Sequence, residues 1–107
     1  MKPKQPKVLE KDITKAIRDF LNFKKIFHWK VRQGLGCQPG IADIIGVMPL
    51  RGKAPGTILA IEIKTEQGVF DKKGNQERFL RSINDSGGIG FVARSTQDVI
   101  DNLKEYW

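Results

Sequence analysis

The sequence has very few of the residues that form disulfides and soft-metal sites. Cys37 is the single cysteine among 107 residues, and His28 is the single histidine. A disulfide within the chain and a cysteine-rich zinc site are therefore excluded, as is any metal site that needs several histidines. A Ser-His-Asp triad would have to use His28, yet no Gly-x-Ser-x-Gly sequence accompanies it. We expect His28 to be a structural or surface residue.

Long apolar runs are missing as well. No run approaches the roughly 20 residues that a membrane-spanning helix needs, and the N-terminus lacks the apolar segment of a signal peptide. We therefore expect a soluble, intracellular protein with no membrane partner. Its location would be the cytoplasm, which is the host cytoplasm if the protein is viral.

Acidic residues are outnumbered by basic ones. The chain has 12 Asp and Glu against 19 Lys and Arg, which gives a net charge of +7 and a pI near 9.8. Small basic proteins often bind polyanions, because lysine and arginine release counterions from phosphates. A solvated basic surface would give the same net charge, so composition alone leaves nucleic-acid binding open.

The length suits a single domain with one modest core. Residues 1–7, MKPKQPK, predict a flexible basic arm, and we expect residues 8–107 to form the domain.

From Val8 to about Phe27 the apolar period is helical, with its stripe at Ile13, Ala16, Ile17, Phe20 and Leu21. Glu10 lies three residues before Ile13 and seven before Ile17, which places it near this stripe, pointing inward. It could equally be a first-turn acid that interacts with the helix dipole.

The remaining elements alternate between short apolar runs and helical patterns. Residues 28–33 predict a strand, 34–40 a loop, 41–47 and 57–63 apolar strands joined by a turn, and 66–75 a basic loop. A helix over 75–85 carries Gln76 on the same face as Phe79, Leu80 and Ile83. A strand over 89–94 and a final helix capped by Ser95 complete the chain. The order α-β-β-β-α-β-α predicts a mixed α/β fold, with helices flanking a central mixed sheet.

Three charged residues interrupt strands that otherwise look buried: Asp43, Glu62 and Lys64. Alternation along a strand places Glu62 and Lys64 on the same face. Buried charges must be paired or must hold a metal, and a simple ion pair would leave one acid uncompensated. Two carboxylates, with the backbone carbonyl of Ile63 as an extra ligand, form an oxygen-rich site for Mg²⁺ or Mn²⁺. Lys64 could then orient a water molecule or stabilise charge on a phosphate.

Asp43, followed after 18 residues by Glu62-Ile63-Lys64, resembles the PD-(D/E)xK nuclease motif. The surrounding segments are more specific and resemble the VRR-NUC domain family, the virus-type replication-repair nucleases. These segments are Gly40-Ile41-Ala42-Asp43-Ile44-Ile45-Gly46, Ile61-Glu62-Ile63-Lys64-Thr65, Gln76-Glu77-Arg78-Phe79-Leu80, Gly87-Gly88 and Phe91-Val92-Ala93-Arg94-Ser95. The similarity extends from Glu10 to about Leu103.

The resemblance implies a metal-dependent phosphodiesterase with a restriction-endonuclease-like core. By position, Glu10 matches the first-helix acid of the family, Asp43 its metal aspartate, Glu62 and Lys64 its acid-x-lysine pair, and Gln76 the glutamine of its next helix. Gln76 is expected to orient substrate or water, with a residue at the rim of the core as its alternative role. Ala42 departs from the proline that the family often has there. Because that proline has no catalytic atom, we expect activity to survive the change.

Stand-alone members of the family resemble Holliday junction resolvases, which implies a homodimer that cuts branched DNA at two sites. The expected phosphate contacts are Lys30, Arg32, Arg51, Lys53, Lys72 and Lys73, with further lysines in the arm; for each one, a solvated cation is the alternative. Two other functions stay open. One is a repair nuclease directed at flaps or nicks, and the other is a non-catalytic DNA-binding module.

Overall fold

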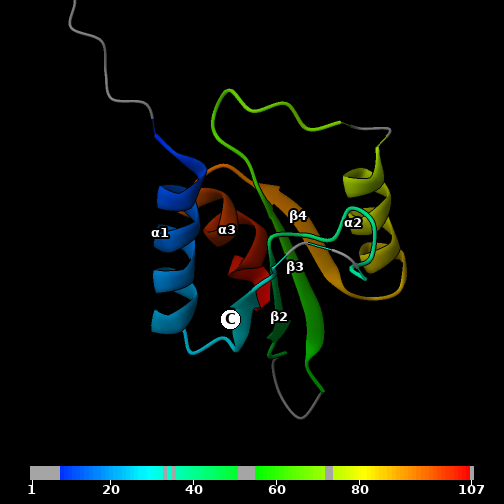
Figure 1. Ribbon diagram of the computed structural model, residues 1–107. Coiled ribbons are helices and arrows are strands. Elements are labelled where there is room, and N and C mark those ends of the chain that lie inside the picture. Colours follow the sequence, from blue (N-terminus) through cyan, green and yellow to red (C-terminus); the bar gives the residue numbers. More distant parts are fainter. Residues whose placement is uncertain (1–7, 33, 35, 51–54, 72–73, 107) are drawn as a thin grey trace, which may run out of the picture.

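The computed structural model describes residues 8–32, 34, 36–50, 55–71 and 74–106. Within these ranges the elements follow the order that the sequence predicts, α-β-β-β-α-β-α (Figure 1). Their bounds are α1 Glu10–Phe23, β1 His28–Lys30, β2 Ile44–Met48, β3 Thr57–Ile63, α2 Asn75–Asp85, β4 Ile89–Ala93, α3 Thr96–Leu103 and the short 3-10 helix η1 Lys104–Tyr106. No helix of these ranges is both long and apolar enough to cross a membrane.

The four strands form one mixed sheet in the order β1-β2-β3-β4. The pairs β1–β2 and β2–β3 are antiparallel, whereas β3 and β4 are parallel. A parallel pair needs a crossover connection, and α2 lies within it. The sheet is therefore mixed, as the sequence predicts.

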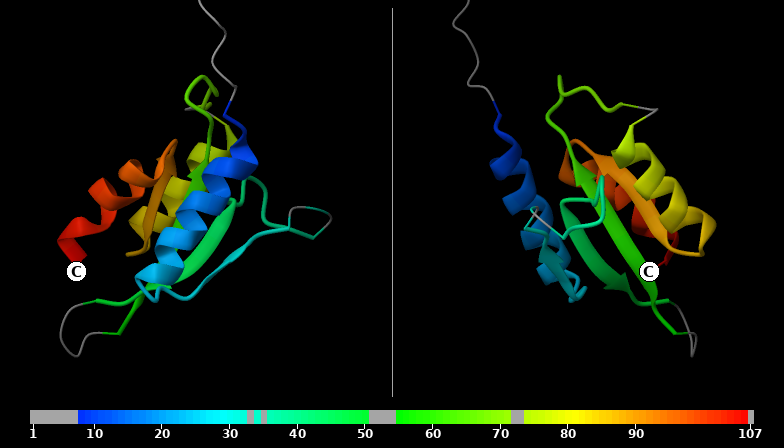
Figure 2. Two further views of the ribbon diagram at one scale, coloured as in Figure 1. Left: turned by 90° about the vertical axis from the view of Figure 1, so that its left-hand side faces the viewer. Right: turned by 45° about the vertical axis from the view of Figure 1, so that its right-hand side comes forward.

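Helices cover both faces of the sheet (Figure 2). On one face α1 and α3 pack against β2, β3 and β4, with Ile17, Leu21, Ile61 and Leu103 fully buried. On the other face α2 packs through Leu80 against a smaller cluster that includes Ala60. Alternation along β3 thus turns Leu59, Ile61 and Ile63 toward α1 and α3, and turns Ala60 and Glu62 toward α2.

The first helix is shorter than the sequence predicts, because it ends in a tight turn after Phe23. Lys25 has a left-handed φ of 58°, and its N–H bonds to the carbonyl of Asn22 while that of Ile26 bonds to Leu21. These are the two bonds of a Schellman motif, and Ile26 is buried by it. Ala16 was predicted to lie in the apolar stripe and is exposed. Glu10 is exposed as well, so it does not point inward, and it has the position of a first-turn acid, the alternative that the sequence leaves open. Glu10 begins the helix, one turn before its first buried residue.

Two strands are shorter or shifted relative to the prediction. The strand expected over 41–47 begins at Ile44, because Gly40, with φ +74°, and Ile41 belong to a turn that packs on α2. The strand expected over 28–33 ends at Lys30, opposite Ile44, where its partner begins. The helix over 75–85 is confirmed, and the side chain of Ser95 caps α3 by accepting a hydrogen bond from the N–H of Asp98.

Candidate active site

Asp43 and Glu62 lie on neighbouring antiparallel strands at one end of the sheet. Ile44 pairs with Ile61, so the register places Asp43, one residue earlier, opposite Glu62. The backbone N–H of Ile63 donates a hydrogen bond of 2.7 Å to Asp43 Oδ2. This bond fixes the Asp43 carboxylate against the end of β3. The structure thus brings together the two acids that the sequence singles out.

Glu62 is buried, and its two oxygens differ sharply in their partners. Only 3% of its side chain is exposed. Oε1 accepts a hydrogen bond of 2.9 Å from Gln76 Nε2 and lies 3.7 Å from Lys64 Nζ. Oε2 is buried without a hydrogen-bond partner among the described residues. A buried carboxylate oxygen with no partner is costly, so this atom needs a ligand or a proton.

Burial is the main reason that the pKa of Glu62 is raised from 4.5 to about 8. Repulsion from the adjacent Asp43 carboxylate raises this pKa further, and the ammonium of Lys64 opposes the rise. Glu10 makes a smaller contribution that also raises it. Two carboxylates thus share a site in which both cannot be ionised without a compensating cation.

Gln76 reaches Glu62 from the first turn of α2, and a close backbone contact sets the position of that turn. A Cβ at Gly40 would clash with the backbone oxygen of Asn75. Only glycine permits this approach, and its φ of +74° also favours glycine. The turn before β2 is therefore packed directly on the residue that precedes Gln76. In Figure 1 the starts of α1 and α2 lie at the same end of the sheet as the end of β3.

Arg94 is a positioning residue to which the sequence analysis assigns no role. Its Nη1 donates hydrogen bonds of 2.6 Å to the carbonyls of Thr65 and Gly68. Its own backbone N–H donates to Asp98 Oδ2 at 2.8 Å. Arg94 thereby ties the loop that follows Lys64 to the start of α3. The sequence offered one signal for Arg94, a cation at the end of the predicted apolar strand over 89–94. The loop carbonyls that it binds could not be predicted from the sequence.

Glu10 stands apart from the two central acids. It is exposed at the start of α1, and it acts on Glu62 through the field of its charge. Across the described ranges, no three His, Cys, Asp or Glu side chains form a group that could hold a metal ion. Asp43 and Glu62 are the pair best placed to share one, and Glu10 could join them only after a movement of its side chain or helix end.

The structure describes only two of the six predicted DNA contacts. Lys30 and Arg32 are exposed, at the end of β1 and just beyond it. The other four predicted contacts lie outside the described residues, as does the arm over residues 1–7; these four are Arg51, Lys53, Lys72 and Lys73.

Comparison with known proteins bears on the fold. No family model matches the sequence, and no curated protein matches it significantly. A solved structure described as a VRR_NUC domain protein superposes with a TM-score of 0.67. The match covers 94% of this chain and 89% of that one, at 19% sequence identity. The chain therefore has the fold of a VRR-NUC domain, the restriction-endonuclease-like arrangement that its sequence motifs predict.

Proposed function

We propose that this protein is a metal-dependent endonuclease that hydrolyses phosphodiester bonds in DNA. One observation carries the proposal: Asp43 and Glu62 meet at the end of the sheet, and Glu62 Oε2 is buried there without a hydrogen-bond partner in the part of the chain that the structure describes. Such an arrangement is unfavourable for a purely structural ion pair, because Lys64 can compensate only one of the two acids. It is favourable for binding a small cation.

The residues present fit a hard divalent cation. Carboxylate oxygens are the ligands that Mg²⁺ and Mn²⁺ prefer, and the unpartnered Oε2 of Glu62 is one available donor. Asp43 and the carbonyl of Ile63 are the other proposed ligands, and Glu10 would complete the set. When bound, such an ion would polarise the scissile phosphate and make a water molecule more acidic.

The side chains around these acids have distinct roles in the proposal. Gln76 holds Glu62 by its Oε1, so that Oε2 remains available. The ammonium of Lys64, 3.7 Å from Glu62, orients the attacking water or stabilises the charge that develops on the phosphate. The bond from the N–H of Ile63 keeps the Asp43 carboxylate in place during the reaction.

DNA as the substrate is supported by the fold and by the net charge of +7. We propose branched DNA, such as a four-way junction, because the domain offers cations for phosphates, and such contacts position DNA by its shape without reading its bases. Symmetric cutting of a junction requires two sites, so the proposal includes a homodimer.

An exposed apolar surface supports the homodimer. Phe27, Trp29, Val47 and Ile58, which we call the apolar sheet patch, are each at least 43% exposed. The register places Val47 opposite Ile58, and the rings of Phe27 and Trp29 lie 5.8 Å apart. These residues lie on the sheet face that α2 covers only over β3 and β4. Contiguous apolar surface of this kind marks an interaction site in soluble proteins.

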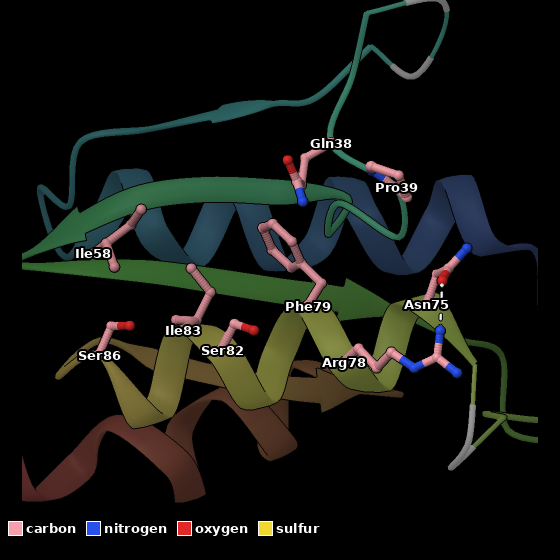
Figure 3. A pocket seen from close by; sticks show the side chains of 9 residues that line it. All are labelled: Gln38, Pro39, Ile58, Asn75, Arg78, Phe79, Ser82, Ile83 and Ser86. Atoms are coloured by element: carbon pink, nitrogen blue, oxygen red, sulfur yellow. Dashed lines mark hydrogen bonds between the residues drawn. The ribbon is translucent and has the colours of Figure 1, made fainter.

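A groove continues the apolar sheet patch toward α2. It has a volume of about 480 Å³, and Ile58, Phe79 and Ile83 point into it (Figure 3). The groove gives a second copy of the chain a concave, mainly apolar surface next to the flat patch. We therefore assign this face to the second copy.

A cleavage panel tests the proposed function. Four-way junctions, flaps, nicked duplex and single strands would be incubated with the protein and Mg²⁺ or Mn²⁺, and with EDTA as the control. We expect the junction to be cut best, only with metal, and Asp43→Asn and Glu62→Gln to abolish cutting without loss of junction binding. Preferred cutting of flaps or nicks would favour a repair nuclease. Binding without cutting under every condition would favour a DNA-binding module.

A further inference from the structure

Helix α1 presents a polar stripe that the proposed site does not use. Lys11, Lys15, Arg18 and Asn22 are spaced by four, three and four residues, so they align along one face of the helix. Ile17 and Leu21 occupy a different, buried face. Together with Lys30 of β1, the stripe lines a groove of about 380 Å³. The left panel of Figure 2 looks onto α1.

The groove has a strong positive charge. Four of its lining residues are cations, and Asp19 is the single acid among them. Asp19 forms a salt bridge of 2.7 Å with Lys15. No salt bridge to Lys11, Arg18 or Lys30 is present within the part of the chain that the structure describes. Three cations therefore stand uncompensated in one groove, where they repel each other unless an anion is bound.

Arg18 is held in position at the wall of this groove. Its Nε donates a hydrogen bond of 3.4 Å to His28 Nε2. His28 Nδ1 lies 2.9 Å from the carbonyl of Ile26, which fits a neutral ring that donates from Nδ1 and accepts at Nε2. Arg18 uses only Nε in this bond, so the Nη atoms of its guanidinium keep their donors for another group. This contact also gives the chain's single histidine the structural role that the sequence predicts.

The groove adjoins the candidate active site at both of its walls. On the helix, Lys11 directly follows Glu10, whose charge acts on Glu62. On the sheet, Lys30 pairs with Ile44, and the N–H of the next residue, Val31, bonds to the carbonyl of Asp43 at 2.8 Å. Lining residues at both walls of the groove are thus neighbours of the acids, Lys11 of Glu10 along the chain and Lys30 of Asp43 across the β1–β2 pair.

We propose that this α1–β1 groove binds the sugar-phosphate backbone of the DNA strand next to the scissile bond. This inference rests on the proposed function for the identity of the polyanion. Lys11 and Arg18 are seven residues apart, which is about 10 Å along a helix. Measured along the axis of duplex DNA, where each strand carries a charge about every 3.4 Å, this distance equals the rise of about three nucleotides. The cations contact phosphates and read no bases, so the groove sets the position of the strand and not a sequence preference.

A binding experiment without metal isolates the groove from catalysis. The double variant Lys11→Gln, Lys30→Gln removes two exposed cations, and Lys104→Gln with Lys24→Gln removes two exposed cations elsewhere. Affinity for a labelled junction and a duplex would be measured in EDTA at several salt concentrations. The slope of log K against log salt is negative, and each lost phosphate contact reduces its magnitude by about 0.9. For the groove variant we therefore expect a slope that is less steep by about 1.8 and an affinity that is lower by about tenfold or more. The control variant should keep a distinctly steeper slope than the groove variant.

Cleavage by the same preparations in Mg²⁺ or Mn²⁺ separates the two proposals. An unchanged slope in the groove variant overturns the inference, even if the wild type cuts DNA as proposed. Weaker binding by the groove variant, with no cutting by the wild type, supports the groove and overturns the nuclease. A wild type that neither binds nor cuts DNA overturns both. Equal losses in the groove and control variants would show a diffuse charge effect and would also overturn the inference.

Discussion

Gln76 Nε2 donates a hydrogen bond of 2.9 Å to Glu62 Oε1, which joins the start of α2 to the end of β3. This bond determines which oxygen of Glu62 stays free. Without it, Oε1 would keep only the longer contact to Lys64, and the carboxylate could rotate toward the ammonium. The amide of Gln76 thus orients the carboxyl group that we propose as a metal ligand.

The first prediction concerns this amide. We expect Gln76→Ala to lower the rate of DNA cleavage by about 10- to 100-fold, the usual effect of removing a group that orients a metal ligand. The variant should also need more Mg²⁺ for half-maximal activity. Gln97→Ala is the matched control, because Gln97 is exposed on α3 and its amide bonds to Asp101 of the same helix. Equal cleavage rates for the Gln76→Ala and Gln97→Ala variants would contradict the proposed role of Gln76 in the site.

The second prediction uses the raised pKa of Glu62. The folded protein holds this proton up to about pH 8, whereas the unfolded chain loses it near 4.5, so the folded state binds more protons between these values. In metal-free buffer, stability should therefore fall as the pH rises from 4.5 to 8, by up to about 1.4 kcal/mol per pH unit. Glu62→Gln should remove this slope, which urea unfolding at a series of pH values measures. If the free energy of unfolding changes equally with pH in the wild type and in Glu62→Gln, the raised pKa of Glu62 is wrong.

Much of the fold could be predicted from the sequence because its signals are local. The apolar runs around Glu62 and the helical period over 75–85 require only neighbouring residues. The pairing of Asp43 with Glu62 followed from the rule that buried charges need partners. The sequence left two positions open for Glu10, inward-pointing or in the exposed first turn, because the choice depends on how far α1 extends beyond the sheet. The role of Arg94 depends on a loop that returns from 26 to 29 residues earlier, which no periodicity encodes.

The third prediction concerns that loop. Arg94→Ala removes two hydrogen bonds from a cation to the carbonyls of Thr65 and Gly68, and should destabilise the protein by about 2 kcal/mol. Because the loop follows Lys64, we also expect kcat for cleavage to fall more than the affinity for DNA. Arg81→Ala is the control, since Arg81 is exposed and forms its salt bridge with Glu77 of the same helix. Its stability should change little. A kcat that is unchanged in Arg94→Ala would limit Arg94 to a purely structural role.

The fourth prediction concerns the apolar sheet patch. Val47→Glu places a charge at the centre of this patch, opposite Ile58, and should convert a dimer into a monomer because the charge would be desolvated in the interface. Val69→Glu is the matched control, since Val69 is more exposed than Val47 and lies in the loop after β3. Light scattering should give twice the 12.1 kDa chain mass for the wild type and control, and the single mass for Val47→Glu. A wild-type monomer at the concentrations used for cleavage would overturn the dimer. A dimer that persists in Val47→Glu would place the interface on another surface.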